Sequence, residues 1–348
     1  MVDGVSENIL IVKPSSIGDI VHSLPVLGKL RAKFPRARIS WLVEVSSAPL
    51  LETNVSLDAV VPFRRRSGGI AGTLFAQKGL LGRLRAGNYD LVVDLQGLLR
   101  SAIFSYATRA RRRVGLSDAR EGARFFYTDI AEVHNGMHAV DRYLLVGDRI
   151  GFSAFRPEFP LEVSKAAHAS VERLLGAAPG LPRPYIALSP GARWPSKNWP
   201  AANFADAGHR LKKRLGGTIF VVGAPSALAQ AREIDTRMGG DAVNLVGRTS
   251  LAELVALLSK MDALVTPDTG AMHVADALGG KVAAVFGPTD PAKTGPYFQR
   301  RNVLIAENAC PDAPCMRRNC PRGDTICMKA VSGDSVARLT ASLLEGNP

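Results

Sequence analysis

The sequence has no long hydrophobic run, few aromatic residues and little cysteine. No apolar stretch approaches the roughly 20 residues of a membrane-spanning helix, so we expect no transmembrane segment. The N-terminus lacks the basic, apolar and small-residue pattern of a signal peptide, which predicts a cytosolic chain. Aromatic residues make up 6%, and there is no zinc-finger, RNP-type or homeodomain signature, so we expect no nucleic-acid partner. The Gly-x-Gly-x-x-Gly fingerprint is also missing, which disfavours a dehydrogenase.

The four cysteines, Cys310, Cys315, Cys320 and Cys327, lie close together near the C-terminus. Their spacing, C-x4-C-x4-C-x6-C, is wider than the C-x2-C pairs of common zinc sites. Disulfides are disfavoured in the cytosol. We therefore interpret this segment as a loop with reduced thiols, and a bound metal is the alternative.

The charge balance is strongly basic. The chain carries 44 Lys and Arg against 31 Asp and Glu, a formal charge of +13. Such an excess indicates an anionic partner, for example a nucleotide, an acidic glycan or an anionic membrane surface. The apolar fraction of 46% and the length of 348 residues are sufficient for two packed domains.

Apolar strand patterns alternate with helical patterns in both halves of the chain. The strands expected in the first half span residues 8–13, 38–45, 57–63 and 89–97. Those expected in the second half span 185–190, 218–224, 242–247, 263–268 and 282–288. The clearest helical stretches are 19–34, 201–216, 227–239, 250–261 and 271–279. This order predicts an α/β fold with doubly wound parallel sheets.

Gly and Pro are concentrated in "GAAPGLPRP", residues 176–184, a composition typical of linkers. We therefore predict two Rossmann-like domains, residues 1–178 and 179–348, facing across a cleft, with the last helix packing back on the first domain. Ligands of such sheets bind beyond the carboxyl ends of the strands. The strand-to-helix corners are thus the places to search for a site.

The first corner, "KPSSIGDIVHSLP", offers Ser15, Ser16, Gly18 and Asp19. Asp19 fits a helix N-cap. It also fits a general base, and the two roles compete because a capping carboxylate is stabilised as the anion.

Two corners of the second half resemble anion sites. In "SPGARWPSKNWP", Arg193 and Lys197 can reach phosphates, although a solvated basic loop would have the same composition. In "VTPDTGAMHVADALGG", Asp268, Thr269 and Gly270 precede a helix whose first amides attract anions, with His273 on its first turn.

A basic segment at residues 64–85, "RRRSGGIAGTLFAQKGLLGRLR", has apolar residues at helical spacing. It can be an ordinary surface helix or can lie against a membrane.

These motifs together resemble glycosyltransferase family 9, the lipopolysaccharide heptosyltransferases. The resemblance rests on "ILIVKPSSIGDIVHSLP", "SPGARWPSKNWP" and "TPDTGAMHVADALGGKVAAVFGPTDP", and it covers nearly the whole chain. It implies the GT-B fold, two Rossmann-like domains. It also implies an inverting transfer without a catalytic metal, and the sequence contains no D-x-D motif.

"VVDLQGLLRSA", "REGARFFY" and "HAVDRYL" resemble the heptosyltransferase I branch in particular. That branch implies ADP-heptose as donor and the Kdo of Kdo2-lipid A as acceptor, at the cytoplasmic face of the inner membrane. By position, Asp19 would be the base. The donor contacts would be Lys197, Asp268, Thr269, Gly270 and His273. The acceptor contacts would be Ser15, Ser16, Gly18, Arg64, Arg65, Arg66, Arg120, His138 and Arg142. We predict that the basic segment 64–85 engages this acceptor or the membrane.

Two stretches depart from that branch. Its members often carry acidic residues where "GAPSALAQ" has Ser226, so a carboxylate for the ribose or the heptose is missing. The cysteine-bearing tail looks more like heptosyltransferase II and its relatives. A heptosyltransferase II-type enzyme, or another family member with a different core-sugar or protein acceptor, is therefore the alternative.

Overall fold

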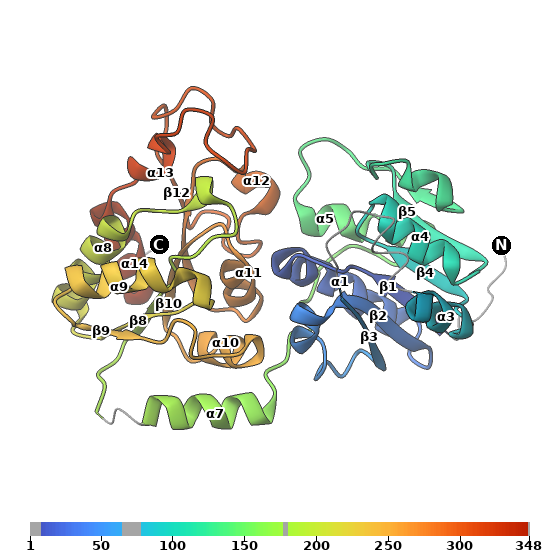
Figure 1. Ribbon diagram of the computed structural model, residues 1–348, viewed down its shortest axis with the longest axis horizontal. Coiled ribbons are helices and arrows are strands. Elements are labelled where there is room, and N and C mark those ends of the chain that lie inside the picture. The colour runs from blue at the N-terminus through green and yellow to red at the C-terminus, as the bar shows by residue number, and fades with distance from the viewer. Residues whose placement is uncertain (1–7, 65–77, 177–179, 347–348) are drawn as a thin grey trace. The chain divides into compact units, whose positions relative to one another are not determined.

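The computed structural model describes residues 8–64, 78–176 and 180–346, and the chain divides into two compact units, Met1–Glu162 and Val163–Pro348 (Figure 1). Each unit contains a six-stranded sheet in which neighbouring strands run parallel. The doubly wound α/β architecture predicted from the sequence is therefore present in both halves.

The N-terminal unit follows the order of alternating strands and helices. Its strands are β1 (Asn8–Val12), β2 (Arg38–Glu44), β3 (Ala59–Phe63), β4 (Leu91–Asp94), β5 (Arg112–Leu116) and β6 (Asp129–Ala131). Its helices are α1 (Ile17–Lys33), α3 (Lys78–Ala86), α4 (Leu99–Ala107), α5 (Ala139–Leu144) and α6 (Gly147–Ile150).

Helices cover both faces of this sheet. The strand order is β3-β2-β1-β4-β5-β6. This is the dinucleotide-fold order, in which strands are added to one edge of the sheet up to β3 and to the other edge from β4 onward, so that a switch point lies between β1 and β4. On one face, Leu80 and Leu84 of α3 and Phe104 of α4 pack against Leu10 and Val92 of the sheet. Helices α1 and α5 pack together on the opposite side of the strands (Figure 1).

The C-terminal unit repeats this plan. Its strands are β7 (Tyr185–Leu188), β8 (Thr218–Val221), β9 (Ala242–Asn244), β10 (Ala263–Pro267), β11 (Lys281–Phe286) and β12 (Val303–Ile305). Its helices are α7 (Lys165–Gly176), α8 (Ala201–Leu215), α9 (Leu228–Arg237), α10 (Leu251–Leu258), α11 (Gly270–Ala277), α12 (Pro291–Thr294), α13 (Ile326–Lys329) and α14 (Gly333–Glu345).

The strand order of the second sheet, β12-β11-β10-β7-β8-β9, is the same order with β7 in the first position. Its switch point therefore lies between β7 and β10. Trp199, Phe204 and Leu211 pack with α9 and α14 over one face of this sheet. Helices α10 and α11 lie on the other face (Figure 1).

The boundary between the units differs from the prediction. The chain divides at 162/163, not at 178/179, because α7 packs on α10 of the C-terminal unit. The Ser170 hydroxyl donates to the Glu253 carboxylate at 2.6 Å, which ties α7 there. The last helix, α14, packs on α8 of its own unit, and Arg214 pairs with Glu345 at 2.6 Å.

The short edge strands β6 and β12, and β5 with its two leading arginines, carry too weak a pattern to be predicted. Of the basic segment 64–85, the structure describes residue 64 and residues 78–85. There α3 packs its apolar face on the sheet, as a surface helix does. Among the described residues, no helix is long and apolar enough to cross a membrane.

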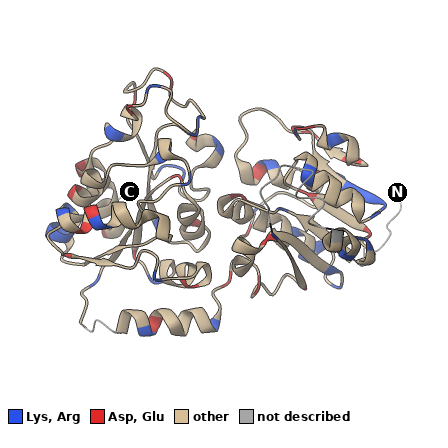
Figure 2. Cartoon of the chain, viewed as in Figure 1, with Lys and Arg blue, Asp and Glu red and all other residues tan. Residues whose placement is uncertain are grey.

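Basic and acidic residues are spread over the helices and loops of both units (Figure 2). Many pair locally, for example Arg210 with Asp206 and with Asp334. Among the described residues, the basic side chains are thus distributed over both units and do not by themselves identify the anionic partner. The site has to be found from the strand ends.

Candidate active site

The switch point of the N-terminal sheet holds the first corner. The chain leaves β1 through Lys13, Pro14, Ser15 and Ser16 and enters α1, while β4 ends beside it at Asp94. Ser16 is the N-cap of α1, and Asp19 is the third helical residue. The sequence left Asp19 open as N-cap or general base; the structure corrects the N-cap interpretation, because Asp19 completes a capping box begun by Ser16.

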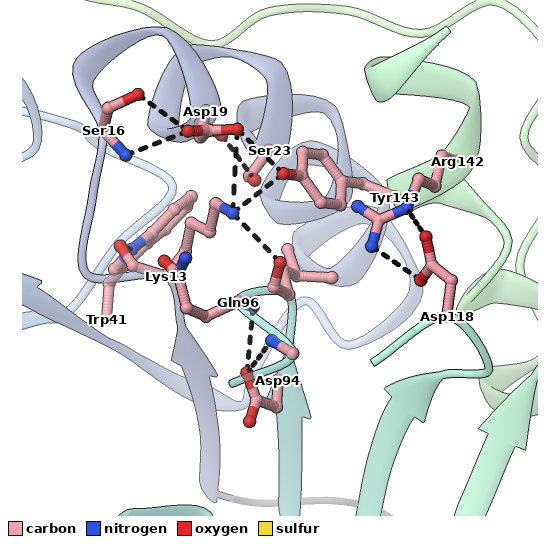
Figure 3. A network of polar contacts seen from close by, with 12 residues as sticks. Lys13, Ser16, Asp19, Ser23, Trp41, Asp94, Gln96, Asp118, Arg142 and Tyr143 are labelled. Carbon is pink, nitrogen blue, oxygen red and sulfur yellow. Dashed lines mark hydrogen bonds and ion pairs between the residues drawn. The ribbon is translucent and has the colours of Figure 1, made fainter. Parts of the chain in front are cut away.

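The Asp19 carboxylate is held from two sides (Figure 3). Its Oδ2 accepts hydrogen bonds from the backbone N–H and the hydroxyl of Ser16, at 3.0 and 2.7 Å. Its Oδ1 accepts from the Tyr143 hydroxyl at 3.1 Å. The side chain remains 41% exposed. A fixed carboxylate that still reaches solvent is suited to take a proton from a ligand.

A buried lysine lies directly behind this carboxylate. The Lys13 ammonium donates to the Leu95 carbonyl at 3.1 Å and to the Tyr143 hydroxyl at 2.8 Å. It lies 3.9 Å from Asp19 Oδ1. Lys13 thereby links β1, the loop after β4 and α5, and it compensates the charge of Asp19 (Figure 3).

The electrostatics favour the ionised form of Asp19. Burial acts to raise its pKa, but the Lys13 ammonium and the hydrogen bonds from Ser16 outweigh burial, so the pKa of Asp19 is lowered. Burial lowers the pKa of Lys13. Burial and the Asp19 charge raise the pKa of Tyr143 well above its usual value, which keeps its hydroxyl protonated and able to donate.

The predicted acceptor residues fall into different environments. The Arg142 guanidinium binds Asp118 through two hydrogen bonds, at 2.6 and 2.7 Å, and lies 5.1 Å from the Tyr143 ring. This places Arg142 next to the Asp19 network. His138 is buried, and its Nδ1 accepts from Val140 N–H to cap α5, so it stabilises the helix that carries Arg142.

Arg120 is exposed on the loop after β5, and its backbone N–H donates to Gly97, after β4, at 2.8 Å. Arg64 is exposed at the end of β3. Arg65 and Arg66 lie outside the described residues. Gly18 is buried in the first turn of α1.

Ser15 lines a small pocket beside the same corner. The pocket has a volume of about 80 Å³, and Ser15, Glu44, Gln96 and Arg100 contribute polar groups to it. These residues come from the carboxyl ends of β1, β2 and β4 and from the first turn of α4. The pocket therefore provides a polar recess at the edge where a ligand of this sheet is expected.

The second and third corners meet at the switch point of the C-terminal sheet. Lys197 lies in the loop after β7, and Asp268 directly follows β10. Lys197 Nζ donates to Asp268 Oδ2 at 2.7 Å, and His273 Nε2 lies 3.5 Å from Asp268 Oδ1. The Thr294 hydroxyl donates to the same carboxylate at 3.4 Å. The structure thus brings together three predicted residues that are up to 76 positions apart.

This corner combines a buried ion pair with a helix N-terminus. The side chains of Lys197 and Asp268 are 16% and 6% exposed. Burial acts to raise the pKa of Asp268, but hydrogen bonding to His273 and the Lys197 charge outweigh it and lower that pKa. The pair is neutral overall, so the first amides of α11, after Thr269 and Gly270, supply the net positive potential.

The remaining donor-side predictions are less buried. Arg193 is exposed on the loop after β7, and Ser226 is exposed in the turn before α9. The Thr269 hydroxyl is within 3.0 Å of the Thr266 hydroxyl. Lys197 also lies over the Trp194 ring, at 4.7 Å from its centroid.

Sequence reasoning did not identify Lys13, Tyr143 and Asp118 as parts of the first corner. Lys13 carried a signal, because it is a charged residue at the end of an otherwise apolar strand. Tyr143 lies inside a stretch that we quoted for the resemblance, but its contact with Asp19 spans 124 positions and leaves no local pattern.

Comparison with known proteins finds a matching family model and similar sequences along most of the chain. A family model described as glycosyltransferase family 9 (heptosyltransferase) matches residues 79–326. Lipopolysaccharide heptosyltransferase 1 of Pseudomonas aeruginosa is 32% identical over 90% of this chain and 87% of its own length.

Two solved structures from Escherichia coli match in fold. Heptosyltransferase WaaC with ADP has a TM-score of 0.73 and 25% identity, covering 98% of this chain and 100% of that chain. ADP-heptose lps heptosyltransferase II has a TM-score of 0.80 and 23% identity, covering 97% and 99%. The GT-B fold predicted from the sequence is confirmed.

Proposed function

The chain belongs to glycosyltransferase family 9, and on that premise we propose that it transfers heptose from ADP-heptose to Kdo in the lipopolysaccharide inner core. It is a glycosyltransferase of the heptosyltransferase type, with relatives that act in lipopolysaccharide biosynthesis. The choice of ADP-heptose as donor and Kdo2-lipid A as acceptor is supported by the similarity to a heptosyltransferase 1 along most of the chain.

The observation that carries the proposal is the Lys197–Asp268–His273 corner at the N-terminus of α11. A nucleoside diphosphate sugar needs cationic groups and amides for its phosphates, and acceptors for its hydroxyls. Lys197 and the first amides of α11 can bind the phosphates, and the Asp268 carboxylate can accept hydrogen bonds from the hydroxyls. Arg193, Thr269 and Gly270 complete this donor-binding corner in the C-terminal unit.

In the N-terminal unit, Asp19 acts as the general base. It takes the proton of the acceptor hydroxyl as that oxygen attacks the anomeric carbon of the donor. The bond to the ADP oxygen breaks, and the configuration inverts without a covalent intermediate. The Lys13 charge keeps Asp19 ionised, and the Tyr143 and Ser16 hydrogen bonds fix its direction. A positioned base commonly contributes roughly 10²- to 10⁴-fold to the rate, and because the lowered pKa of Asp19 makes it a weaker base, we expect the lower part of this range.

The leaving ADP develops negative charge as the glycosidic bond breaks. Lys197, the amides of α11 and the Thr269 hydroxyl offset this charge, so we expect no catalytic divalent metal. A preorganised donor of this type commonly contributes roughly 3 kcal/mol to the transition state. The positive charge would therefore come from the protein, and we expect the transfer step to need no cofactor.

We further propose that the enzyme works at the cytoplasmic face of the inner membrane, where its lipid-linked acceptor lies. Arg85 of α3, Arg109 after α4 and Arg113 of β5 line a pocket of about 490 Å³. Tyr106 of α4, which is 60% exposed, lines it as well. Clustered arginines beside an aromatic ring suit anionic headgroups. Arg64, Arg120 and Arg142 are the described arginines proposed for the Kdo carboxylates or lipid A phosphates.

Two features favour a second candidate function, heptose transfer of the heptosyltransferase II type to an acceptor that already carries one heptose. Ser226, exposed in the turn before α9, stands where an acid would fit the heptosyltransferase I pattern, and the cysteine-bearing segment is present beside the donor corner. Both features were the departures from the heptosyltransferase I pattern. The two candidates share the donor and differ only in the acceptor.

The deciding experiment incubates the enzyme with ADP-heptose and either Kdo2-lipid A or heptosyl-Kdo2-lipid A, followed by mass spectrometry. The proposal expects one heptose added to Kdo2-lipid A. Addition only to the heptosylated acceptor would support the second candidate. ADP, UDP and GDP are compared by thermal shift, and stabilisation by UDP or GDP rather than ADP would contradict the proposed donor.

A further inference from the structure

The segment that joins β12 to α13 is long and has little regular structure. Residues 306–325 contain no helix or strand, whereas most connections in compact domains are shorter than about 12–15 residues. Asn308, Met316 and Thr325 adopt positive φ angles of 49–60°, a region that non-glycine residues rarely occupy. A segment of this kind needs a source of order other than a hydrogen-bonded ladder.

All four cysteines of the chain are in or next to this segment, and they line one common cavity. Cys310, Cys315, Cys320 and Cys327 share a cavity of about 10 Å³ with Ser196 and Pro288. That volume is about the size of one water molecule. Cys327 is buried, the other three are half-buried, and none forms a disulfide. Widely spaced cysteines are thus gathered around a space for one small group.

The same segment supports the donor corner. Ser196 precedes Lys197, and its hydroxyl donates to the Arg317 carbonyl at 2.6 Å while its N–H donates to the Arg318 carbonyl at 3.2 Å. The Met316 N–H donates to the Pro288 carbonyl at 2.8 Å, which ties the segment to the end of β11. Any group that orders this segment therefore also orders the backbone next to Lys197.

We propose that Cys310, Cys315, Cys320 and Cys327 bind one thiophilic divalent cation, Zn²⁺ or Fe²⁺, as a structural staple beside the donor corner. Four thiolates around a single small space match the tetrahedral, sulfur-rich sites that these ions prefer. The intervals between the cysteines along the chain favour free thiols, but these intervals do not show which cysteines are close in the folded protein. The fold adds that all four cysteines line the same cavity.

The proposal includes a local closure of the loop. In the described part of the chain, no three His, Cys, Asp or Glu side chains are already placed as a metal-ligand set, so the sulfurs have to draw together around the ion. Four thiols give up four protons and the cation gains four sulfur ligands, which leaves a net charge of −2. Arg317, Arg318 and Arg322 lie within the same loop and offset this charge.

The test measures metal in the full-length, untagged protein purified without chelators. Elemental analysis is expected to find about one equivalent of zinc or iron per chain. After metal removal under reducing conditions, Co²⁺ is added as a spectroscopic probe. Tetrahedral thiolate coordination gives intense d–d bands in the red and sulfur-to-cobalt charge transfer in the near ultraviolet. Both signals are expected to saturate at one equivalent.

Cys315→Ser and Cys320→Ser are expected to weaken Zn²⁺ binding by at least roughly 100-fold. Met316→Leu, which alters an exposed sulfur of the same loop, is the matched control and should retain full metal content. If the wild-type protein neither copurifies with metal nor develops the cobalt spectrum, the proposal is wrong. Binding that survives in both serine variants, or a non-reduced mass that shows disulfides, would overturn it too.

Metal removal is also expected to weaken ADP binding severalfold while the N-terminal unit keeps its structure. This arm rests on the proposed function, because it assigns ADP to the Lys197 corner. Stoichiometric metal with unchanged ADP affinity would leave the metal site standing and refute its link to the donor corner. Failure of the cobalt titration, by contrast, refutes the site whatever the enzyme transfers.

Discussion

Replacement of Lys197 by Met tests the donor corner most directly, because it removes the ammonium and keeps the length of the side chain. Lys197 Nζ and Asp268 Oδ2 are 2.7 Å apart, which corresponds to an attraction of about 6 kcal/mol at an effective dielectric constant of 20. Desolvation of both groups offsets part of this. Breaking a buried pair from one side nevertheless costs about 3–5 kcal/mol, since a charge is left unpaired.

We expect Lys197→Met to destabilise the C-terminal unit by about 3 kcal/mol, the lower end of that range, because Thr294 and His273 still contact Asp268. The melting temperature should fall by about 6–12 °C. The double variant Lys197→Met/Asp268→Asn removes both charges and should recover at least about 1.5 kcal/mol of this loss.

ADP affinity and the free energy of unfolding should respond differently in these two variants. Loss of one charge-assisted contact to a phosphate costs about 1.5–3 kcal/mol, so ADP should bind about 10- to 150-fold more weakly to Lys197→Met. The double variant should recover stability without recovering ADP affinity. Lys293→Met, at an exposed lysine on neighbouring α12, is the control and should change neither quantity appreciably.

Urea denaturation followed by circular dichroism gives the stabilities, and calorimetric titration with ADP gives the affinities. Single-variant effects that add to the double-variant value within about 0.5 kcal/mol would show that the pair is not coupled. Wild-type ADP affinity in Lys197→Met would remove Lys197 from the donor site, whatever the stabilities show.

Further predictions concern the first corner and pH. Asp19→Asn should lower turnover by about 10²- to 10⁴-fold with unchanged ADP affinity and circular dichroism; retained turnover would exclude Asp19 as the base. Tyr143→Phe removes the hydroxyl that binds Asp19 and Lys13, and should destabilise the N-terminal unit by about 1 kcal/mol and lower kcat more than it changes the KM for the donor; equal urea midpoints for variant and wild type would contradict this. Arg142→Ala should raise the KM for the acceptor and leave the KM for ADP-heptose unchanged; an equal rise in both would argue against an acceptor role. Because the pKa of Asp268 is lowered in the folded protein, its contribution to stability is complete above the usual Asp pKa of about 3.9 and is lost as the pH falls below it. Urea midpoints between pH 3 and 7 should show this loss in the wild type and a smaller loss in Asp268→Asn.

Much of the fold follows from the sequence because parallel strands buried on both faces are continuous apolar runs. β1, β4 and β10 are of this kind, with nearly every residue buried. β5 could not be predicted this way, because it begins with two arginines at the sheet surface, and the three-residue edge strands β6 and β12 carry almost no pattern. The domain boundary was misplaced because α7 belongs to the second unit through packing with α10, which local composition does not encode.

The candidate site was predictable in part for a similar reason. Asp19, Lys197 and Asp268 follow strand ends, and parallel topology brings the strand ends beside a switch point together. Lys13 and Tyr143 could not be assigned, since their roles depend on contacts across 130 positions. The arrangement of the four cysteines around one cavity likewise depends on how the loop folds, not on the intervals between them.

The pinned carboxylate of Asp19 would also confer regioselectivity on the transfer. Ser16 occupies Oδ2 with two hydrogen bonds, and Tyr143 occupies one side of Oδ1, so a single direction remains for an incoming hydroxyl. A sugar such as Kdo offers several hydroxyls of similar acidity. The fixed orientation of the Asp19 carboxylate, rather than the intrinsic reactivity of the sugar, would then decide which hydroxyl is glycosylated.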